Sequence, residues 1–238
     1  MPPDPGVFQP GGPKSLNAPP TPPTSNYRLN HLALRIKDPA RSLRFYIELL
    51  GMRMVFSMNA GPFTIYYLGH PPPNTSDVEE WARTTSEIPA LTRTSGLLEL
   101  YHVHGTERVY SQQPDSKSQA QVDAEAGDAE DAEKGEGGGG ENQIHISNGN
   151  QPPHLGFAHL GFTVPDIRDA LERLRAAGVP ILKDLGMCSR ETAGLSRWEE
   201  ERGVGRGEIH TNYAWFFEKF AMVADPDGYS IELIPQNI

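Results

Sequence analysis

An internal repeat constrains the fold of this chain more than any other feature. Residues 31–38 read HLALRIKD and residues 159–166 read HLGFTVPD, so each stretch opens on a histidine and closes on an aspartate. A glutamate between apolar residues follows each histidine, 68 residues later at Glu99 and 73 residues later at Glu232. Matched positions in two stretches predict two copies of one module. Such a duplication can bring two histidines and two glutamates to a pseudo-twofold axis.

Each copy predicts a βαβββ module. In the first copy a strand at 28–37 leads into Asp38-Pro39, which suits the start of a helix that runs to about Leu50. In the second copy a strand at 157–164 leads into Asp166, which suits the start of a helix that ends at Gly178. Further strands are predicted at 52–58, 63–68 and 96–103 in the first copy, and at 179–183, 214–223 and 229–234 in the second. The predicted fold class is α+β, with the two modules forming one cupped, mixed sheet.

The chain divides by composition as well as by repeat. Residues 1–25 hold nine prolines and no apolar run, and the stretch from 111 to 153 is acidic and glycine-rich with little apolar content. Such segments cannot bury enough surface to offset the entropy lost on ordering. We therefore predict a disordered proline-rich N-terminus (1–26), a first module (27–110), a disordered acidic loop (111–153) and a second module (154–238) with an insertion at 184–213.

Charge and cysteine content exclude several function classes. The stretch 111–153 holds nine acidic residues and two lysines, so it carries −7 of the net charge of −10. The small remainder gives no sign of nucleic-acid or membrane binding. One cysteine, Cys188, excludes an internal disulfide framework and suits a reducing compartment. We predict a cytoplasmic protein with a small-molecule partner.

Strand alternation predicts that the four repeated side chains share one face. Leu98 and Leu100 point toward the helices, which turns Glu99 to the concave side, and Ile231 and Leu233 do the same for Glu232. His102 and His104 fall on the opposite alternation and point away from the cup. A single strand histidine is more often structural than a ligand, but a carboxylate facing a sheet core is costly unless paired or metal-bound. Because the coincidence occurs twice, the pattern favours a divalent metal held by two imidazoles and two carboxylates.

At these residues the chain resembles the glyoxalase I (lactoylglutathione lyase) family of the vicinal oxygen chelate (VOC) superfamily. The similar segments cover most of residues 27–236, apart from the acidic loop and the insertion: 34–52, 98–107, 156–166 and 225–232. The resemblance implies that one divalent ion is held by His31, Glu99, His159 and Glu232. It implies zinc, with nickel as the alternative, because a histidine at the first position is typical of the nickel branch while the longer segments resemble the zinc branch.

The resemblance also implies a substrate and its contacts. The family reaction, which detoxifies methylglyoxal, isomerises its hemithioacetal with glutathione to S-lactoylglutathione. Glu232 would be the general base and ligand, and Glu99 a ligand and second proton carrier. Arg35 matches an arginine that contacts the glutathione carboxylate, and Lys183 a lysine on its other side. Val103 and Leu155 depart from the family, which usually has an asparagine and an arginine there, and these departures put glutathione in doubt as the thiol.

Three alternatives stay open on the sequence. The chain is a glutathione-dependent lyase, another enzyme of the superfamily such as a dioxygenase or epimerase, or a binding protein that has lost turnover. A dioxygenase would need two histidines and one carboxylate around iron, so the second glutamate argues against it. The resemblance further implies a homodimer as one arrangement, because related proteins build the site either across a subunit interface or between the modules of one chain.

Overall fold

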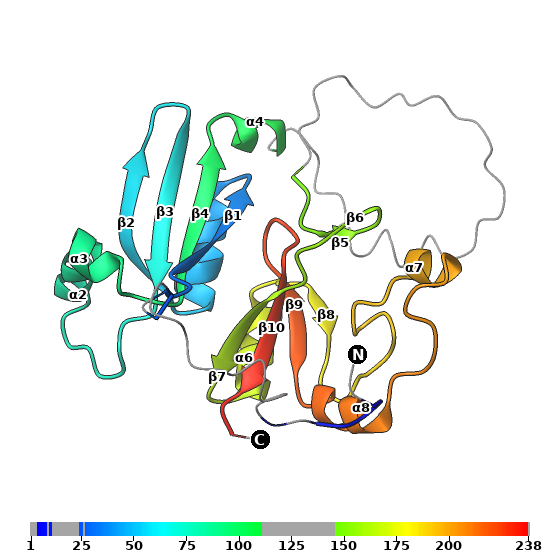
Figure 1. Cartoon of the computed structure of the whole chain (residues 1–238). Helices are drawn as coiled ribbons and strands as arrows, with labels where there is room; N and C mark the ends of the chain where they lie inside the picture. The colour runs from blue at the N-terminus through cyan, green and yellow to red at the C-terminus, as the bar shows by residue number, and fades with distance from the viewer. Residues whose placement is uncertain (1–3, 9, 11–23, 26, 111–145, 238) are drawn as a thin grey trace.

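The computed structural model describes residues 4–8, 10, 24–25, 27–110 and 146–237. Most of the predicted proline-rich N-terminus and of the predicted acidic loop therefore lies outside the described residues. Two four-stranded sheets with helices packed against them make up the described chain (Figure 1). The predicted α+β class with two βαβββ modules is confirmed.

The first sheet has the strand order β1-β4-β3-β2, with β1 parallel to β4 and the other neighbours antiparallel. Asp38 begins the connecting helix as predicted, because its carboxylate accepts a hydrogen bond from the Ala40 amide at 2.8 Å. Gly51, with φ 78°, supplies the left-handed residue just after that helix. The elements of the first module are β1 (His31–Ile36), α1 (Pro39–Leu43), η2 (Arg44–Leu49), β2 (Arg53–Asn59), β3 (Phe63–Gly69), α2 (Val78–Ser86), α3 (Ile88–Leu91), β4 (Leu97–Val103) and α4 (Thr106–Tyr110).

The second sheet repeats this order as β7-β10-β9-β8, again with the outer β7 parallel to β10. Asp166 begins α6 as predicted, accepting hydrogen bonds from the amides of Arg168 and Asp169. The elements are β7 (Leu160–Val164), α6 (Ile167–Ala176), β8 (Ile181–Lys183), α7 (Arg197–Glu201), α8 (Thr211–Phe217), β9 (Ala221–Ala224) and β10 (Ser230–Pro235). Identical strand order and direction confirm the duplication.

The structure differs from the sequence prediction at residues 214–220. A strand was predicted from 214 to 223, but α8 occupies Thr211–Phe217 and only β9 is extended. Tyr213, Phe217 and Phe220 recur at helical spacing, and their rings contact one another. The His210 side chain accepts from the Asn212 amide at 3.1 Å and so begins the helix. Aromatic content favours a strand, but here packing at helical spacing overrides that propensity.

A second difference lies at the end of the predicted acidic loop. Residues 150–151, assigned to that loop, form β5 (Asn150–Gln151), which pairs antiparallel with β6 (His154–Leu155). Asn148 ties this hairpin to the second module, because its amide donates to the carbonyl of Gly228 at 2.9 Å. Local hydrogen bonding holds the segment without an apolar core.

Both modules contribute to one core. The buried cluster joins Leu34, Leu98 and Leu100 of the first sheet to Leu160, Ile231 and Leu233 of the second, with the helices between. Polar contacts cross the same junction. Tyr46 donates to Asp225 at 2.8 Å, and Asp227 accepts from the Ser42 hydroxyl and the Lys37 amide, both at 3.1 Å. The turn at 225–228, closed by the Gly228 amide donating to the Asp225 carbonyl, is therefore also the joint between the modules.

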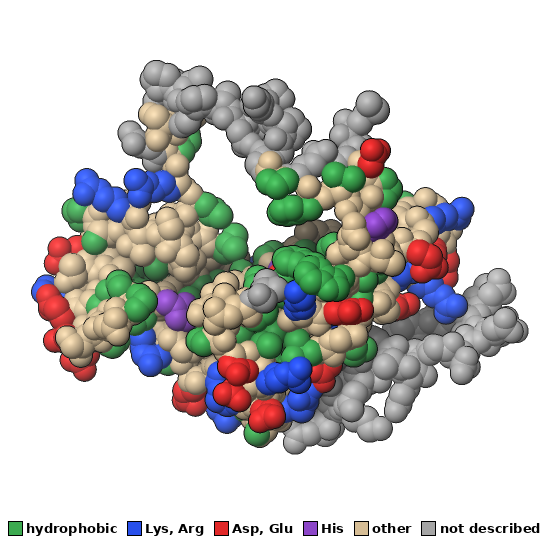
Figure 2. All heavy atoms as spheres, turned by 90° about the horizontal axis from the view of Figure 1, so that it is seen from below, with side chains coloured by type: hydrophobic (Ala, Val, Ile, Leu, Met, Phe, Trp, Pro, Cys, Tyr) green, Lys and Arg blue, Asp and Glu red, His purple; other side chains and the backbone are tan. Residues whose placement is uncertain are grey.

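The surface visible from below carries both signs of charge. In Figure 2, Lys and Arg side chains alternate with Asp and Glu side chains, and hydrophobic side chains lie between them. That face holds no extended patch of one sign of the kind that binds nucleic acid. Among the described residues, no helix is long and apolar enough to span a membrane.

Candidate metal-binding site

The first histidine and the first glutamate meet on the sheet. In the register of β1 and β4, Ala33 pairs with Glu99, so His31 lies two residues before the partner of Glu99 and on the same face. Nε2 of His31 is 3.3 Å from Oε2 of Glu99. The histidine side chain is 36% exposed and the glutamate 15%. The pair is thus reachable from solvent but held against the sheet.

The second pair repeats this geometry. Gly161 of β7 pairs with Glu232 of β10, which again places His159 two residues before the partner of the glutamate. Nε2 of His159 is 3.4 Å from Oε2 of Glu232, and the two side chains are 41% and 13% exposed. An added Cβ at position 161 would lie 3.4 Å from Ile234 and 3.9 Å from the Glu232 carboxylate, which is ordinary contact, and the matching position of the first module holds Ala33. Two equivalent half-sites result from two equivalent registers.

The two half-sites do not come together within one chain. In both modules the pairs lie on the strand face opposite the leucines that join the shared core. Over the described part of the chain, no three His, Cys, Asp or Glu side chains gather closely enough to hold a metal ion. The sequence brings each histidine to its own glutamate, but a four-ligand cluster does not form in a single copy.

Each half-site nevertheless fits two neighbouring positions around a divalent ion. Metal–nitrogen and metal–oxygen bonds of about 2.0–2.2 Å place adjacent donors about 3.0 Å apart at a right angle and about 3.4 Å apart at the tetrahedral angle. The observed 3.3 and 3.4 Å lie within this range. Imidazole with carboxylate is also a donor set that zinc and nickel accept. The residues present therefore fit the metal that the sequence predicts.

Two neighbours of the first pair were not singled out from the sequence. Tyr67 pairs across from Glu99 in the sheet, and its hydroxyl lies 3.2 Å from Nε2 of His31. Burial, followed by a hydrogen bond to Glu99, raises the pKa of the Tyr67 hydroxyl, so the phenol stays protonated. Nδ1 of His31 lies 2.8 Å from Oδ1 of Asn30. Tyr67 could have been identified only from the pairing of β3 with β4, which cannot be read from the sequence.

The second pair has different surroundings. Met222 occupies the position opposite Glu232 that Tyr67 occupies opposite Glu99. The α8 residue Tyr213 is close enough that, after burial, the charge of Glu232 raises the pKa of its hydroxyl. Within the described residues, His159 has no hydrogen-bonded partner other than Glu232. The second half-site is therefore less tightly held than the first.

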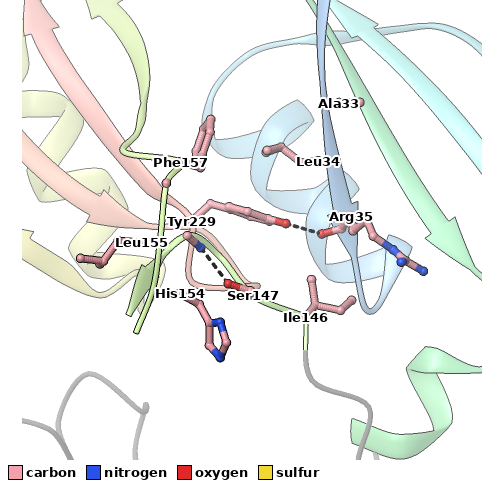
Figure 3. Close-up of a pocket in the computed structure, with 11 residues that line it drawn as sticks. Ala33, Leu34, Arg35, Ile146, Ser147, His154, Leu155, Phe157 and Tyr229 are labelled. Atoms are coloured by element: carbon pink, nitrogen blue, oxygen red, sulfur yellow. Dashed lines mark hydrogen bonds between the residues drawn. The ribbon is translucent and has the colours of Figure 1, made fainter. Parts of the chain in front are cut away.

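Arg35 lies on the β1 face that carries His31, four residues further along. Its guanidinium carbon is 5.8 Å from the centre of the Tyr101 ring, which itself stacks on Phe63. Its carbonyl accepts a hydrogen bond from the Tyr229 hydroxyl at 3.0 Å (Figure 3). A cation at the edge of the first half-site is consistent with the predicted contact to a substrate carboxylate, which stays a prediction.

A cavity of about 600 Å³ lies beside Arg35, between β1 and the segment that holds the β5–β6 hairpin (Figure 3). Its walls are mainly apolar, and Leu155, where the related family usually has an arginine, is one of them. Arg35 is the only arginine of the eleven lining residues. Val103, the other departure, ends β4 and is half-buried. Among the residues that line this cavity, Arg35 therefore supplies the one guanidinium group.

Lys183 is buried, and backbone carbonyls already occupy its ammonium group. Its side chain is 1% exposed, and the ammonium donates to the carbonyls of Phe217 at 2.9 Å, Phe220 at 2.5 Å and Asp184 at 3.4 Å. These three contacts use all three donors, and burial lowers the pKa of the ammonium. Lys183 holds the end of α8, whose last carbonyls need donors. The predicted contact with a substrate carboxylate does not fit this arrangement.

Comparison with known proteins gives a consistent result. The model of the Glyoxalase/Bleomycin resistance protein/Dioxygenase superfamily matches residues 28–233. Lactoylglutathione lyase of Pseudomonas aeruginosa is 30% identical over 221 residues, covering 90% of this chain and 86% of that protein. Glyoxalase I of Saccharomyces cerevisiae is 31% identical over 208 residues, 87% of this chain but 44% of the yeast protein, so the chain spans about half of that relative. The crystal structure of glyoxalase I from Zea mays aligns over 87% of this chain and 44% of that one, with 18% identity and a TM-score of 0.44.

Proposed function

Because the chain belongs to the Glyoxalase/Bleomycin resistance protein/Dioxygenase superfamily, we propose that it is a metal-dependent lactoylglutathione lyase. It isomerises the hemithioacetal of methylglyoxal and glutathione to S-lactoylglutathione. The repeated histidine–glutamate pair in matched register is the observation that carries this proposal. Identity of 30% with a lactoylglutathione lyase over most of both chains supports the choice of reaction.

His31, Glu99, His159 and Glu232 hold one divalent ion, zinc with nickel as the alternative. When bound, the ion supplies positive charge beside the two adjacent substrate oxygens on which negative charge develops as a carbon-bound proton leaves. His31 and His159 act only as ligands. The imidazole–carboxylate set fits this role because it leaves positions of the ion open to substrate.

Glu232 is the base that takes the proton from one carbon and returns it to the neighbouring carbon. A carboxylate that moves a proton must be free to change partners. Among the described residues Glu232 lies within ion-pair distance of His159 alone, while Tyr213 and Lys183 are close enough for its charge to act on them. Glu99 is hydrogen-bonded by Tyr67, whose hydroxyl also lies 3.2 Å from Nε2 of His31, so the carboxylate is held beside that ring. Glu99 serves as the second proton carrier, for the hydroxyl proton that must pass from one substrate oxygen to the neighbouring oxygen, and Arg35 binds a carboxylate of the thiol substrate.

A second copy of the chain completes the site. Since one chain holds two separate half-sites, a twofold dimer that joins the first pair of one copy to the second pair of the other gives two identical four-ligand sites. In a twofold (isologous) interface every contact occurs twice. If the first half-site of one copy contacts the second half-site of the other, the second half-site of the first copy contacts the remaining half-site in the same way. The pairs lie at β1 and β7, the outer strands of the two sheets, which places them at the sheet margins where a second copy can approach.

A purified-protein metal analysis followed by an activity assay tests the proposal. The assay follows formation of the thioester by absorbance after mixing methylglyoxal and glutathione with the metal-loaded chain. We expect about one divalent ion per chain and thioester formation that stops on chelation and resumes with added zinc or nickel. Metal binding without thioester formation would move the chain to another enzyme of the superfamily, and no metal binding would make it a binding protein. A cytoplasmic location, which a single free cysteine suits, is checked by fractionation.

A further inference from the structure

We propose that Asn30 is a positioning residue that fixes the protonation pattern of the His31 ring. Its side-chain oxygen holds the ring proton on Nδ1, so that Nε2 presents a lone pair to the divalent ion. The inference rests on the proposed function only in taking His31 as a ligand. The protonation pattern itself is a property of the metal-free chain and can be measured without metal or substrate.

The amide of Asn30 has only one orientation that satisfies its neighbours. Nδ2 lies 2.8 Å from the carbonyl of Leu91 and 2.5 Å from the carbonyl of Thr94. Carbonyl oxygens only accept, so the amide nitrogen with its two hydrogens must face them. The oxygen Oδ1 therefore faces the ring, 2.8 Å from Nδ1 of His31. A flipped amide would place an oxygen against two carbonyls and is excluded.

This orientation determines the form of the neutral imidazole. Because Oδ1 can only accept, Nδ1 of His31 must carry the ring hydrogen and donate it. Nε2 is then unprotonated, and it is the atom that lies 3.3 Å from Glu99. A histidine that binds metal through one nitrogen commonly donates from the other to such an oxygen, which fixes both tautomer and ring plane.

Asn30 is itself firmly held. Its two acceptors, the carbonyls of Leu91 and Thr94, belong to the end of α3 and the turn after it, where helix carbonyls lack internal partners. Its own carbonyl accepts from the Leu97 amide at the start of β4 at 3.2 Å. Three hydrogen bonds therefore anchor the residue that orients His31. Through these hydrogen bonds, the α2–α3 segment between β3 and β4 helps to hold Asn30, and with it His31, in place.

The second module lacks this device. Ala158 precedes His159, and a methyl side chain cannot accept a hydrogen bond. Within the described residues nothing else accepts from Nδ1 of His159. The two proposed histidine ligands can therefore be compared within one chain. Asn30 fixes the ring of His31, whereas Ala158 cannot fix the ring of His159.

The test measures the tautomer of His31 and the metal affinity of variants. Histidine ring nitrogens are recorded by NMR in the metal-free chain over a pH series, the neutral form of the ring being used to identify the tautomer, and the His31 signals are assigned with His31→Gln. Zinc affinity is measured by competition with a chelator. Asn30→Ala removes the acceptor. Asn148→Ala is the matched control, because Asn148 also bridges a carbonyl and a backbone amide but contacts no histidine.

The Nδ1–H form of His31 is expected in the wild-type chain, with a shift toward the Nε2–H form and about 10–100-fold weaker zinc binding in Asn30→Ala. Asn148→Ala is expected to change neither. An Nε2–H ring in the wild-type chain, or unchanged zinc affinity in Asn30→Ala, overturns the proposal. A chain that binds zinc but forms no thioester would refute the lyase function and leave the role of Asn30 intact.

Discussion

The two half-sites share a frame but not their surroundings. In both modules the parallel outer strand and its neighbour place a histidine 3.3–3.4 Å from a glutamate. Around the first pair, Asn30 and Tyr67 supply hydrogen bonds. Around the second pair, the matched positions hold Ala158 and Met222, which supply none. Strand register decides where the ligands lie, and the neighbours decide how far each ligand can move.

This contrast divides the chemistry between the modules. His31, whose Nδ1 is hydrogen-bonded to Asn30, and Glu99, which is hydrogen-bonded by Tyr67, form a rigid pair of ligands for a cation. A glutamate without such a partner can exchange a proton between two carbons. The first module is thus suited to holding the metal and the second to moving the proton. The predictions below test this division.

The largest expected effect comes from removing the base. Glu232→Gln should fold and bind metal but lose turnover by about 10²–10⁴-fold, the usual contribution of a general base. Glu99→Gln should lose more metal affinity, yet keep a larger share of turnover when metal is saturating. Thioester formation and zinc affinity, measured on both variants, decide the matter. Greater loss of turnover in Glu99→Gln would reverse the roles of the two modules.

The joint between the modules also differs on its two sides, since the first supplies donors and the second supplies the carboxylates of Asp225 and Asp227. Burial, then the neighbouring charge of Asp227, raises the pKa of Asp225 from 3.8 to about 7. The folded chain therefore binds this proton more tightly than the unfolded chain. Its contribution to stability is complete below about pH 4 and is lost as the pH rises through about 7.

We expect the loss of this contribution to lower the free energy of unfolding by about 2–4 kcal/mol as the pH rises from 4 to 7. Asp225→Asn cannot ionise; its one oxygen still accepts from the amides of Asp227 and Tyr229, and its amide nitrogen can donate to the Tyr46 hydroxyl. Its unfolding free energy, measured in denaturant across this range, should therefore lack that component. Asp166→Asn, at an exposed helix start, is the control. Parallel pH curves for Asp225→Asn and the wild-type chain would show that Asp225 does not titrate with folding.

The smallest expected effect concerns Tyr67. Tyr67→Phe removes one hydroxyl from the first half-site, and a typical hydrogen bond contributes about 0.5–1.5 kcal/mol. Zinc affinity should fall by about 2–13-fold, and turnover at saturating metal should change little. Tyr66→Phe serves as the control, because Tyr66 packs against the core from the opposite face of β3. An equal loss in both variants would show that the effect comes from packing.

The sequence predicted what depends on local pattern. Asp38 and Asp166 begin their helices because their side chains cap backbone amides, and the alternation around Glu99 and Glu232 follows from strand geometry. The strand predicted over α8 failed because its aromatic residues pack at helical spacing. Tyr67 and Lys183 were beyond reach for another reason. The neighbours of both depend on tertiary pairing, across β3–β4 for Tyr67 and against the end of α8 for Lys183, which no spacing in the chain records.

The assembly of the site was equally beyond local pattern. Sequence repeats predict two equivalent pairs, and both pairs formed. Whether the pairs meet within one chain depends on how the helices share a core. Leu171 and Leu174 of α6 pack in the same cluster as Phe45 and Tyr46 of the first module. Side chains buried in this way hold the two half-sites apart, and the repeat itself carries no trace of that packing.

Complementation between two inactive chains tests the central claim most directly. One copy carries His31→Ala and Glu99→Gln, the other carries His159→Ala and Glu232→Gln, and differently tagged copies are co-expressed and isolated through both tags. If half-sites combine across a twofold interface, each such dimer has one intact site, and about half of wild-type activity should return. Doubly tagged dimers as inactive as either variant alone would contradict the account.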